Sequence, residues 1–319
     1  MSSPTVVITD QSFANLNHER RIIVAAGAQL KVASCKTPEQ VIEACADADV
    51  LIVQFAPINA AVLRALKHCK AIIRYGIGVD NVDLVTAKSL GIRVANIPNY
   101  CIDEVADHTV ALALALGRQL LSTHQRLGCG EWKITPPAAM PAFREMTFAV
   151  IGLGRIGRAV LARARGFGFK LAAYDPLQSV EVFAQANAQS LTLPEVFRTA
   201  DILSLHTPLT EATRHLVSTE RLTAMKRTAI LVNTSRGGLI DSLALADALQ
   251  QGLIAGAGLD VFEQEPLPPT HRLLQAPGTI LTSHTAWFSE ASVPRLQQLA
   301  AEEAVRALKN EQLLNIVNK

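Results

Sequence analysis

Three side chains that could bind an anion or move a proton each follow an apolar run in the second half of the chain. Arg236 lies in Asn233-Thr-Ser-Arg-Gly-Gly238, Glu265 in Asp260-Val-Phe-Glu-Gln-Glu-Pro266, and His284 in Ser283-His-Thr-Ala-Trp287. A guanidinium binds a carboxylate or the carbonyl beside it, which suits a 2-oxo acid. A histidine supplies a proton near neutral pH, and a nearby glutamate favours its protonated form. These residues predict a site that handles a small oxo acid.

Each of the three residues also has an ordinary structural interpretation. Taken alone, His284 fits a hydrogen-bonded structural histidine, and Arg236 fits a surface charge or a loop clamp. Glu265 lies in a proline-rich turn, where a solvated carboxylate is the usual finding. The chemical interpretation therefore depends on the elements that bring the three together.

A glycine-rich segment marks a nucleotide site earlier in the chain. Gly152-Leu-Gly-Arg-Ile-Gly157 follows the apolar run Phe148–Ile151 and opens a helical stretch that runs to about Gly168. The glycines permit a tight turn, close approach of backbone to a pyrophosphate, and close packing of helix on strand. The helix amino terminus then offers unpaired N–H groups and positive potential to the phosphates. A plain strand-to-helix turn is the alternative.

The next apolar run ends in an acid, in Ala172-Ala-Tyr-Asp175. A carboxylate at this strand end accepts hydrogen bonds from the ribose hydroxyls of NAD and repels the 2′-phosphate of NADP. The sequence therefore predicts NAD as cofactor. A solvated strand-end carboxylate is the alternative interpretation of Asp175.

The elements that would position these residues form two β-α-β series. In the first, the predicted strands are Thr5–Thr9, Leu30–Ala33, Val50–Val53, Ala71–Tyr75 and Arg93–Ile97. In the second, they are Thr147–Gly152, Lys170–Asp175, Asp201–His206, Ala229–Thr234, Gly256–Val261 and Ile280–Ser283. Continuous apolar runs indicate strands covered on both faces, as in parallel sheets. We expect an α/β protein with two doubly wound parallel-sheet domains, the second of Rossmann size.

A helical segment and a loop lie between the two series, and another helical segment follows the second series. Glu104–Leu121 is apolar at helical spacing, and the glycine- and proline-containing segment Gly128–Pro137 cannot continue a helix, so we expect an exposed loop or arm there. The amphipathic stretch Glu290–Asn310 has no following strand in the second series, which predicts a return to the first domain. The predicted domains are 1–100 (substrate), 101–286 (NAD-binding Rossmann) and 287–319 (the substrate domain's last helix).

Composition narrows the class of function. The chain has 319 residues, 49% of them apolar, a net charge of +2 and only 5% aromatic residues, which disfavours nucleic acid as a partner. Five cysteines, an odd number without a C-x-x-C pair or a His/Cys cluster, predict reduced thiols and no metal site. With no signal-peptide pattern, and with its most apolar stretch about half the ~20 residues that a membrane span needs, we expect a cytoplasmic protein without a membrane partner.

Several motifs in order make the sequence recognisable. They are Tyr75–Asp83, Glu104–Thr109, Gly152–Gly157, His206–Thr213, Val232–Gly237, Gly258–Pro266 and Ser283–Trp287. Over essentially the whole chain the sequence resembles the D-2-hydroxyacid dehydrogenase family. The resemblance implies a Rossmann nucleotide domain inserted into a flavodoxin-like substrate domain, and hydride transfer between NAD and a small 2-hydroxy or 2-oxo acid. It also implies a homodimer formed through residues 104–141.

The resemblance further implies roles for individual residues. Arg236, Glu265 and His284 would be catalytic, with His284 protonating the substrate oxygen, Glu265 tuning His284, and Arg236 orienting the 2-oxo acid. Cofactor contacts would come from Gly152, Leu153, Gly154, Arg155, Ile156, Gly157, Asp175, His206, Thr207, Pro208, Thr234, Ser235 and Asp260. The amides of Gly76, Ile77 and Gly78 would hold the substrate carboxylate.

The branch within the family is indicated by Asn99–Asp107 and Thr285–Glu290, which look most like the phosphoglycerate dehydrogenase and C-terminal-binding-protein branch. There the tryptophan borders the substrate pocket, so Trp287 is a candidate wall, or else a packing residue at a helix start. Arg74 stands where phosphoglycerate dehydrogenases carry a cation, or else is a solvated group at a strand end. Gln54 is expected to face the pocket. The substrate stays open among phosphoglycerate, glycerate or hydroxypyruvate, and glyoxylate.

Two other functions remain open at this level. One is an NAD(H)-sensing interaction protein of the C-terminal-binding-protein type, although the intact Arg236, Glu265 and His284 argue against loss of catalysis. The other is oxidation of phosphite, since phosphite enzymes keep the same three residues. Formate oxidation is disfavoured because formate dehydrogenases usually carry glutamine at the position of Glu265.

Overall fold

The computed structural model describes residues 3–136 and 138–319, and the chain divides into two compact units. The first unit runs to Cys101 and also includes Phe288–Lys319, and the second comprises Ile102–Trp287. The first two residues and Pro137, the last residue of the predicted loop, lie outside the described residues.

The first unit contains a five-stranded parallel sheet with the order β2-β1-β3-β4-β5, the flavodoxin-like order. Its strands are β1 (Thr5–Ile8), β2 (Gln29–Val32), β3 (Val50–Val53), β4 (Ala71–Arg74) and β5 (Arg93–Ala95). Its helices are α1 (Asn17–Ala25), α2 (Pro38–Cys45), α3 (Ala60–Ala65), α4 (Leu84–Ser89) and α12 (Ser292–Leu308). The central strand β3 is fully buried, whereas the edge strand β2 is largely exposed.

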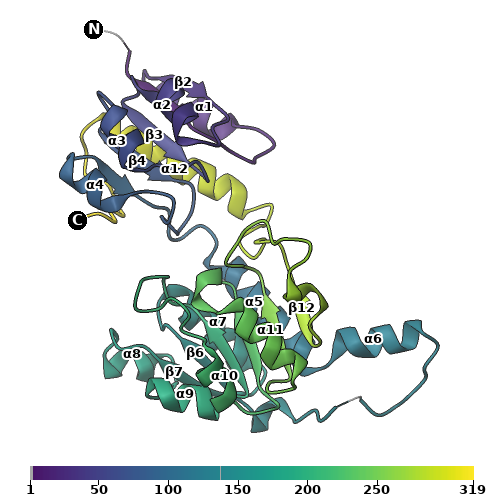
Figure 1. The fold of residues 1–319 in the computed structure, drawn as a ribbon. Coiled ribbons are helices and arrows are strands. Elements are labelled where there is room, and N and C mark those ends of the chain that lie inside the picture. Colours follow the sequence, from purple (N-terminus) through teal and green to yellow (C-terminus); the bar gives the residue numbers. More distant parts are fainter. Residues whose placement is uncertain (1–2, 137) are drawn as a thin grey trace. The chain divides into compact units, whose positions relative to one another are not determined.

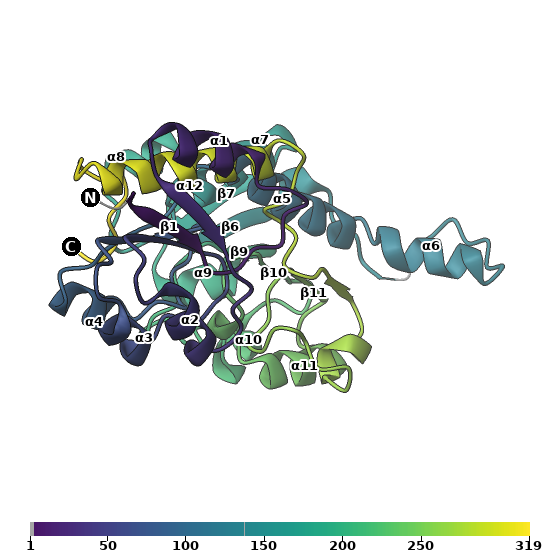
Figure 2. The same ribbon diagram turned by 90° about the horizontal axis from the view of Figure 1, so that it is seen from above.

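Helices cover both faces of this sheet. Leu51 and Val53 pack into one core with α2, α3 and α4. On the other side, α12 lies along α1 and packs against β3 and β4 (Figure 2). The last helix of the chain thus completes the unit in which the chain begins.

The second unit contains a seven-stranded parallel sheet with the order β12-β11-β10-β9-β6-β7-β8. Its strands are β6 (Thr147–Ile151), β7 (Lys170–Tyr174), β8 (Gln189–Ser190), β9 (Ile202–Leu205), β10 (Ile230–Asn233), β11 (Gly256–Leu259) and β12 (Thr279–Leu281). Its α-helices are α5 (Ile102–Gly117), α6 (Leu120–Gly128), α7 (Arg155–Gly166), α8 (Val180–Gln185), α9 (Leu193–Thr199), α10 (Thr219–Ala224) and α11 (Ser242–Gln250). Short 3₁₀ turns are η1 (Phe143–Glu145), η2 (Gly237–Leu239) and η3 (Arg272–Gln275).

Alternate residues of β6 enter two different cores. Ala149 and Ile151 pack with α9, α10 and α11, and Phe148 and Val150 pack with α5, α7 and α8. Both faces of the strand are therefore buried, as its unbroken apolar run predicts. The expected α/β class with two parallel sheets is confirmed.

Two details of the predicted elements are wrong. The predicted helix Glu104–Leu121 ends at Gly117, and α6 is a separate helix after Gln119, which has a left-handed backbone conformation. Gly117, the last residue of α5, lies against the Phe143 ring, and a Cβ there would come within 3.0 Å of it. The second series was predicted to have six strands, but a seventh, β8, is added by two exposed polar residues that carry no apolar signal.

Helix α6 and the segment after it, residues 120–136, form an arm that projects from the second unit (Figure 1). No residue of α6 is buried in the described structure. Among the described residues we find no helix with the length and apolar character of a membrane span. Nor do His, Cys, Asp and Glu side chains cluster there in a metal-binding group.

Candidate active site

The loops that follow the strands of the second unit all leave the same edge of its parallel sheet. The order of the strands reverses at β6 and β9, and ligands of open α/β sheets bind at the carboxyl ends beside such a switch point. Every predicted cofactor and catalytic residue lies on α7 or on one of these loops. The sheet thus brings together positions that are far apart in the sequence.

The glycine loop after β6 is shaped by contacts of its own backbone. A Cβ on Gly152, whose φ is +96°, would lie 2.4 Å from the His206 carbonyl oxygen, and one on Gly157 would lie 2.1 Å from the Gly152 oxygen. A Cβ on Gly154 would meet open space. The first and third glycines are needed for packing, and the second leaves the backbone open to a ligand.

Helix α7 begins directly after this loop. Gly154 is its N-cap and provides no side-chain hydrogen bond to the first turn. The N–H groups at the helix start therefore need another acceptor, and a pyrophosphate supplies one. Arg155 adds a cationic side chain at the same helix end. Loop and helix fit a dinucleotide.

Asp175 follows β7 and holds the glycine loop. Its Oδ2 accepts a hydrogen bond from the Leu153 N–H (2.8 Å), and its Oδ1 accepts one from the Leu177 N–H (2.9 Å). The carboxylate is thus fixed beside the nucleotide loop, at the position where an acid favours NAD over NADP.

The His206–Pro208 loop follows β9 and lies against the glycine loop. Burial lowers the pKa of His206 to about 3, so its imidazole is neutral at pH 7. Its Nε2 lies 2.9 Å from Ser204 Oγ, and its carbonyl oxygen packs against Gly152. Because a neutral, buried imidazole brings no positive charge to the phosphates, any contact from this loop must come from hydrogen bonds or shape.

The Arg236 turn is held by an asparagine that sequence reasoning missed. Asn233, fully buried at the end of β10, donates from Nδ2 to the Arg236 carbonyl (2.9 Å) and accepts from the Ser235 N–H (3.0 Å). Arg236 Nη1 donates to the Ser235 carbonyl (2.6 Å). Among the other predicted contacts, Ser235 Oγ donates to the Leu205 carbonyl and Thr234 Oγ1 is hydrogen-bonded to Thr109. An asparagine before a turn of small residues was the available signal.

Glu265 and His284 form a hydrogen-bonded pair, with Glu265 Oε2 2.7 Å from His284 Nδ1. Burial opposes ionisation of Glu265, but hydrogen bonds from His284 and the Phe262 N–H, with the positive charge of Arg236, lower its pKa. A carboxylate can only accept, so His284 Nδ1 carries the proton of this bond. The Nε2 atom of His284 is therefore the one that can exchange a proton with a substrate.

Asp260 organises the loop that carries His284. Its carboxylate is buried and accepts hydrogen bonds from the N–H groups of Thr285 and Ala286, both at 2.9 Å, and from the Thr282 hydroxyl. Its carbonyl accepts the His284 N–H at 2.8 Å. These bonds hold His284 in a left-handed conformation, with φ +55°. The structure thus places Asp260 beneath the catalytic candidate, with its carboxylate already engaged.

The predicted substrate residues of the first unit lie at the carboxyl ends of β3 and β4. Gly76 has φ +137°, and the Arg74 guanidinium occupies the place where its Cβ would stand. The Gly76 N–H donates to the Arg74 carbonyl (2.9 Å), so this amide is engaged within the loop. Asn96 holds the Ile77 carbonyl (2.6 Å). Arg74 also lies over the exposed Phe55 ring, 5.9 Å from its centroid.

Gln54 is buried, in contrast to its neighbour Phe55. Its Nε2 donates to Ser12 Oγ (3.0 Å), and its side chain is only 3% exposed. The Asp10 carboxylate, another residue that sequence reasoning missed, accepts the backbone N–H groups of Gln54 and Phe55. Trp287, the last residue of the second unit, is half-buried.

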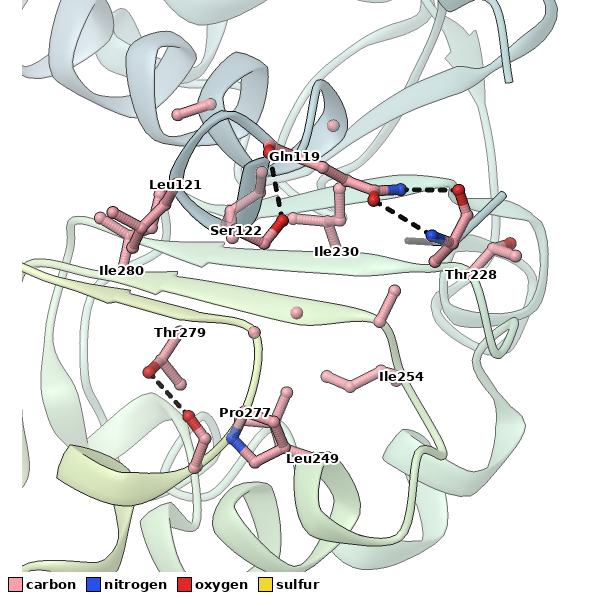
Figure 3. A pocket seen from close by; sticks show the side chains of 18 of the residues that line it. Gln119, Leu121, Ser122, Thr228, Ile230, Leu249, Ile254, Pro277, Thr279 and Ile280 are labelled. Atoms are coloured by element: carbon pink, nitrogen blue, oxygen red, sulfur yellow. Dashed lines mark hydrogen bonds between the residues drawn. The ribbon is translucent and has the colours of Figure 1, made fainter. Parts of the chain in front are cut away.

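A cavity of about 840 Å³ lies at the amino-terminal ends of strands of the second unit's sheet, opposite the ends that carry the glycine loop (Figure 3). It is bordered by the ends of α5 and α6 and by the segments that precede β10, β11 and β12. Arg227 is the one ionisable residue among its described lining residues. With no acid or base to move a proton, this cavity is not the catalytic site.

Comparison with known proteins identifies the family of the chain. The sequence profile of the NAD-binding domain of D-isomer specific 2-hydroxyacid dehydrogenases matches residues 110–286. The chain is 38% identical over 283 residues to a glyoxylate reductase of Korarchaeum cryptofilum, covering 88% of this chain and 85% of that protein. The chain belongs to the D-isomer specific 2-hydroxyacid dehydrogenase family. As in other members of this family, its second unit is an NAD-binding domain.

Further 2-hydroxyacid dehydrogenases match over most of the chain. A D-3-phosphoglycerate dehydrogenase of Methanocaldococcus jannaschii is 37% identical over 304 residues, which are 94% of this chain and 58% of that longer protein. A glyoxylate reductase structure from Paecilomyes thermophila has a TM-score of 0.90 at 26% identity, with 99% of each chain covered. A D-lactate dehydrogenase of Aquifex aeolicus, solved with NAD and lactic acid, has a TM-score of 0.89 at 26% identity, covering 98% and 99% of the two chains.

Proposed function

We propose that this 2-hydroxyacid dehydrogenase reduces small 2-oxo acids of the glyoxylate and hydroxypyruvate class with NADH. The observation that carries the proposal is the Glu265–His284 pair, hydrogen-bonded at 2.7 Å on the sheet edge that also carries the glycine loop. The pair supplies a proton donor beside a nucleotide site, which is what reduction of a carbonyl to an alcohol needs. Two glyoxylate reductases among the similar proteins favour this substrate class.

The residues that would hold NAD are those of the glycine loop, the start of α7, and Asp175. When bound, NADH supplies the hydride for the substrate carbonyl carbon. His284 gives a proton from Nε2 to the carbonyl oxygen, and Glu265, hydrogen-bonded to Nδ1, stabilises the imidazolium that serves as donor. We place Asp260 near the nicotinamide. Its carboxylate holds the loop that carries His284.

Arg236 is assigned the polarisation of the 2-oxo group and orientation of the acid. A fixed guanidinium stabilises the negative charge that grows on the carbonyl oxygen during reduction. For the first unit, we propose that the loop of Gly76, Ile77 and Gly78 binds the substrate carboxylate through its amides. Since the Gly76 N–H is engaged by Arg74, we assign the closest contacts to the next two amides.

Within the family, we place the chain near the phosphoglycerate dehydrogenase and C-terminal-binding-protein branch, with Trp287 as a substrate wall. A phosphoglycerate dehydrogenase at 37% identity is among the similar proteins, as are glyoxylate reductases at 37% and 38%, so the placement rests on the motifs Asn99–Asp107 and Thr285–Glu290. Arg74, stacked over Phe55, offers a cation that would suit a phosphorylated acid. A phosphorylated 2-oxo acid therefore belongs among the substrates to be assayed.

The substrate class is tested by NADH oxidation, followed at 340 nm, with glyoxylate, hydroxypyruvate, 3-phosphohydroxypyruvate and 4-methylthio-2-oxobutyrate. We expect the highest kcat/KM with glyoxylate or hydroxypyruvate, and a lower kcat/KM with NADPH than with NADH because Asp175 repels the 2′-phosphate. Highest activity with the phosphorylated acid would move the assignment to phosphoglycerate. Tight NADH binding without turnover of any acid would favour an NADH-sensing protein instead.

We also propose that the chain forms a homodimer through residues 104–141. The arm exposes several large apolar side chains, with Trp132 82% and Ile134 92% exposed, and Leu120, Leu121 and Leu127 exposed as well. An apolar surface of this kind is typical of an interaction site. A second copy presents the same surface, so two arms can cover each other under twofold symmetry.

Light scattering after gel filtration tests the dimer. We expect twice the chain mass of 34.3 kDa for the wild type and a shift to the monomer for Leu127→Asp combined with Ile134→Asp. Val180→Asp is the matched control, because Val180 is equally apolar and 79% exposed but lies on α8. A monomeric wild type, or a double variant that stays dimeric, contradicts the proposal.

A further inference from the structure

A second histidine–carboxylate pair lies close to the proposed catalytic pair and has no assigned role. His215 Nε2 is 2.6 Å from Glu263 Oε1. His215 lies in the segment after β9, and Glu263 lies after β11, only two positions before Glu265. Both side chains are partly exposed, at 43% and 30%, so an isolated ion pair here would contribute little to stability. The further contacts of Glu263 and of His215 indicate a role other than stabilising the fold.

Glu263 is anchored to the start of helix α11. Its Oε2 accepts the backbone N–H of Ser242 at 3.0 Å and also the Ser242 hydroxyl. Burial opposes ionisation of Glu263, but the hydrogen bonds from Ser242 and His215 outweigh it and lower its pKa. Glu263 is thus a carboxylate at neutral pH, held at the positive end of a helix.

His215 reaches the Arg236 turn through its backbone. Its N–H donates to the Gly238 carbonyl at 2.8 Å, within the 3₁₀ turn that directly follows Arg236. Its φ of +49° lies in the left-handed region, which is uncommon for residues other than glycine although histidine tolerates it better than most. The same residue therefore contacts the Arg236 turn with its main chain and the loop after β11 with its side chain.

The Arg236 turn and the loop after β11 are also pressed directly together. A Cβ on Gly237 would lie 1.8 Å from the Phe262 carbonyl carbon and 2.3 Å from the Glu263 nitrogen. The Phe262 N–H in turn donates to Glu265 Oε1 at 2.9 Å. The loop from Phe262 to Glu265 is therefore fixed at its first two residues, and its last residue reaches His284.

We propose that Glu263 and His215 are positioning residues that hold the Glu265 loop on the Arg236 turn and so set where Glu265 meets His284. The inference rests on the proposed roles of Arg236, Glu265 and His284. Neither Glu263 nor His215 needs to touch substrate or cofactor. Their contribution is to the alignment of the proton donor, and small displacements of aligned groups cost large factors in rate.

The test compares Glu263→Ala with the conservative Glu263→Gln. Alanine removes both anchors, and we expect kcat to fall by about tenfold to 10²-fold, while the Kd for NADH changes by less than about twofold because the glycine loop is untouched. The primary isotope effect with NADH deuterated at the transferred position should rise, because a misaligned site makes the chemical step rate-limiting. Glutamine keeps an acceptor for Ser242 and a partner for His215, so it should restore kcat to within about threefold of wild type.

Asp247→Ala is the matched control. Asp247 lies on α11, the helix that Glu263 anchors, and forms an exposed ion pair with Arg272. Its loss should therefore leave kcat and the isotope effect unchanged. If Glu263 only caps α11, Glu263→Ala will lower the melting temperature and leave both kinetic quantities as in wild type. That result overturns the inference.

Crystal structures of wild type and Glu263→Ala separate this inference from the proposed function. We expect Glu265 Oε2 to move out of hydrogen-bond distance of His284 Nδ1 in the variant. If the two atoms stay at about the 2.7 Å of the present structure, the positioning role is wrong whatever the activity. If instead wild type turns over no 2-oxo acid, the proposed function fails, and the two crystal structures still decide the positioning role.

Discussion

Replacing His284 by asparagine is expected to lower kcat for 2-oxo acid reduction by about 10²- to 10⁴-fold, the usual contribution of a positioned general acid. Asparagine suits this position because it tolerates the left-handed backbone, with φ +55°, that Asp260 imposes on His284. It can also keep a hydrogen bond to Glu265. The substitution therefore removes the transferable proton and leaves the loop in place.

The measurement is steady-state turnover with glyoxylate, accompanied by NADH binding measured from its fluorescence. The Kd for NADH should stay within about threefold of the wild-type value, since the glycine loop and Asp175 are unaffected. A variant that retains more than a tenth of wild-type kcat would show that His284 is not the proton donor.

Replacing Arg236 by alanine is expected to lower kcat/KM for the 2-oxo acid by 10²-fold or more, about the effect of losing one donor to a developing oxyanion. Part of the loss should be a raised KM, because the guanidinium also binds the acid in the ground state. Arg236→Lys keeps the charge but not the two-pronged geometry, so it should recover only part of the loss.

Melting temperature controls for a folding defect in the Arg236 variants. The turn is also held by the Asn233 side chain and by the backbone packing of Gly237 on Phe262, which both variants keep when the bond from the guanidinium to the Ser235 carbonyl is lost, so both should fold. Equal kcat/KM for wild type and Arg236→Ala would remove Arg236 from the site.

Strand positions were predictable because each central strand is a short apolar run that ends in a glycine or a polar residue. The glycine loop was predictable for the same local reason, and Gly152 and Gly157 are packed as that motif requires. The chain's α/β class follows from these repeated runs. By contrast, β8 consists of two exposed polar residues and depends on pairing with β7, which no local pattern reveals.

The parts of the site that sequence reasoning missed depend on contacts between distant segments. His215 and Glu263 are 48 positions apart, and they meet only because β9, β10 and β11 are adjacent in the sheet. Asp10 likewise accepts the backbone N–H groups of Gln54 and Phe55, 44 and 45 positions away. Asn233 differs, because it holds the turn that directly follows it, and an asparagine before a turn of small residues was a signal in the sequence. Gln54, expected to face the pocket, is buried and donates a hydrogen bond from Nε2 to Ser12 Oγ, and its place in the substrate site stays a prediction.

The most direct test of the enzyme's chemistry is isotope transfer from NADH deuterated at the nicotinamide C4 to glyoxylate. The wild-type protein is expected to yield glycolate that carries deuterium at C2, detected by NMR, with one NADH oxidised for each glycolate formed. A labelled cofactor that stays unoxidised with glyoxylate and with every other 2-oxo acid of the panel, while binding tightly, would contradict the assignment.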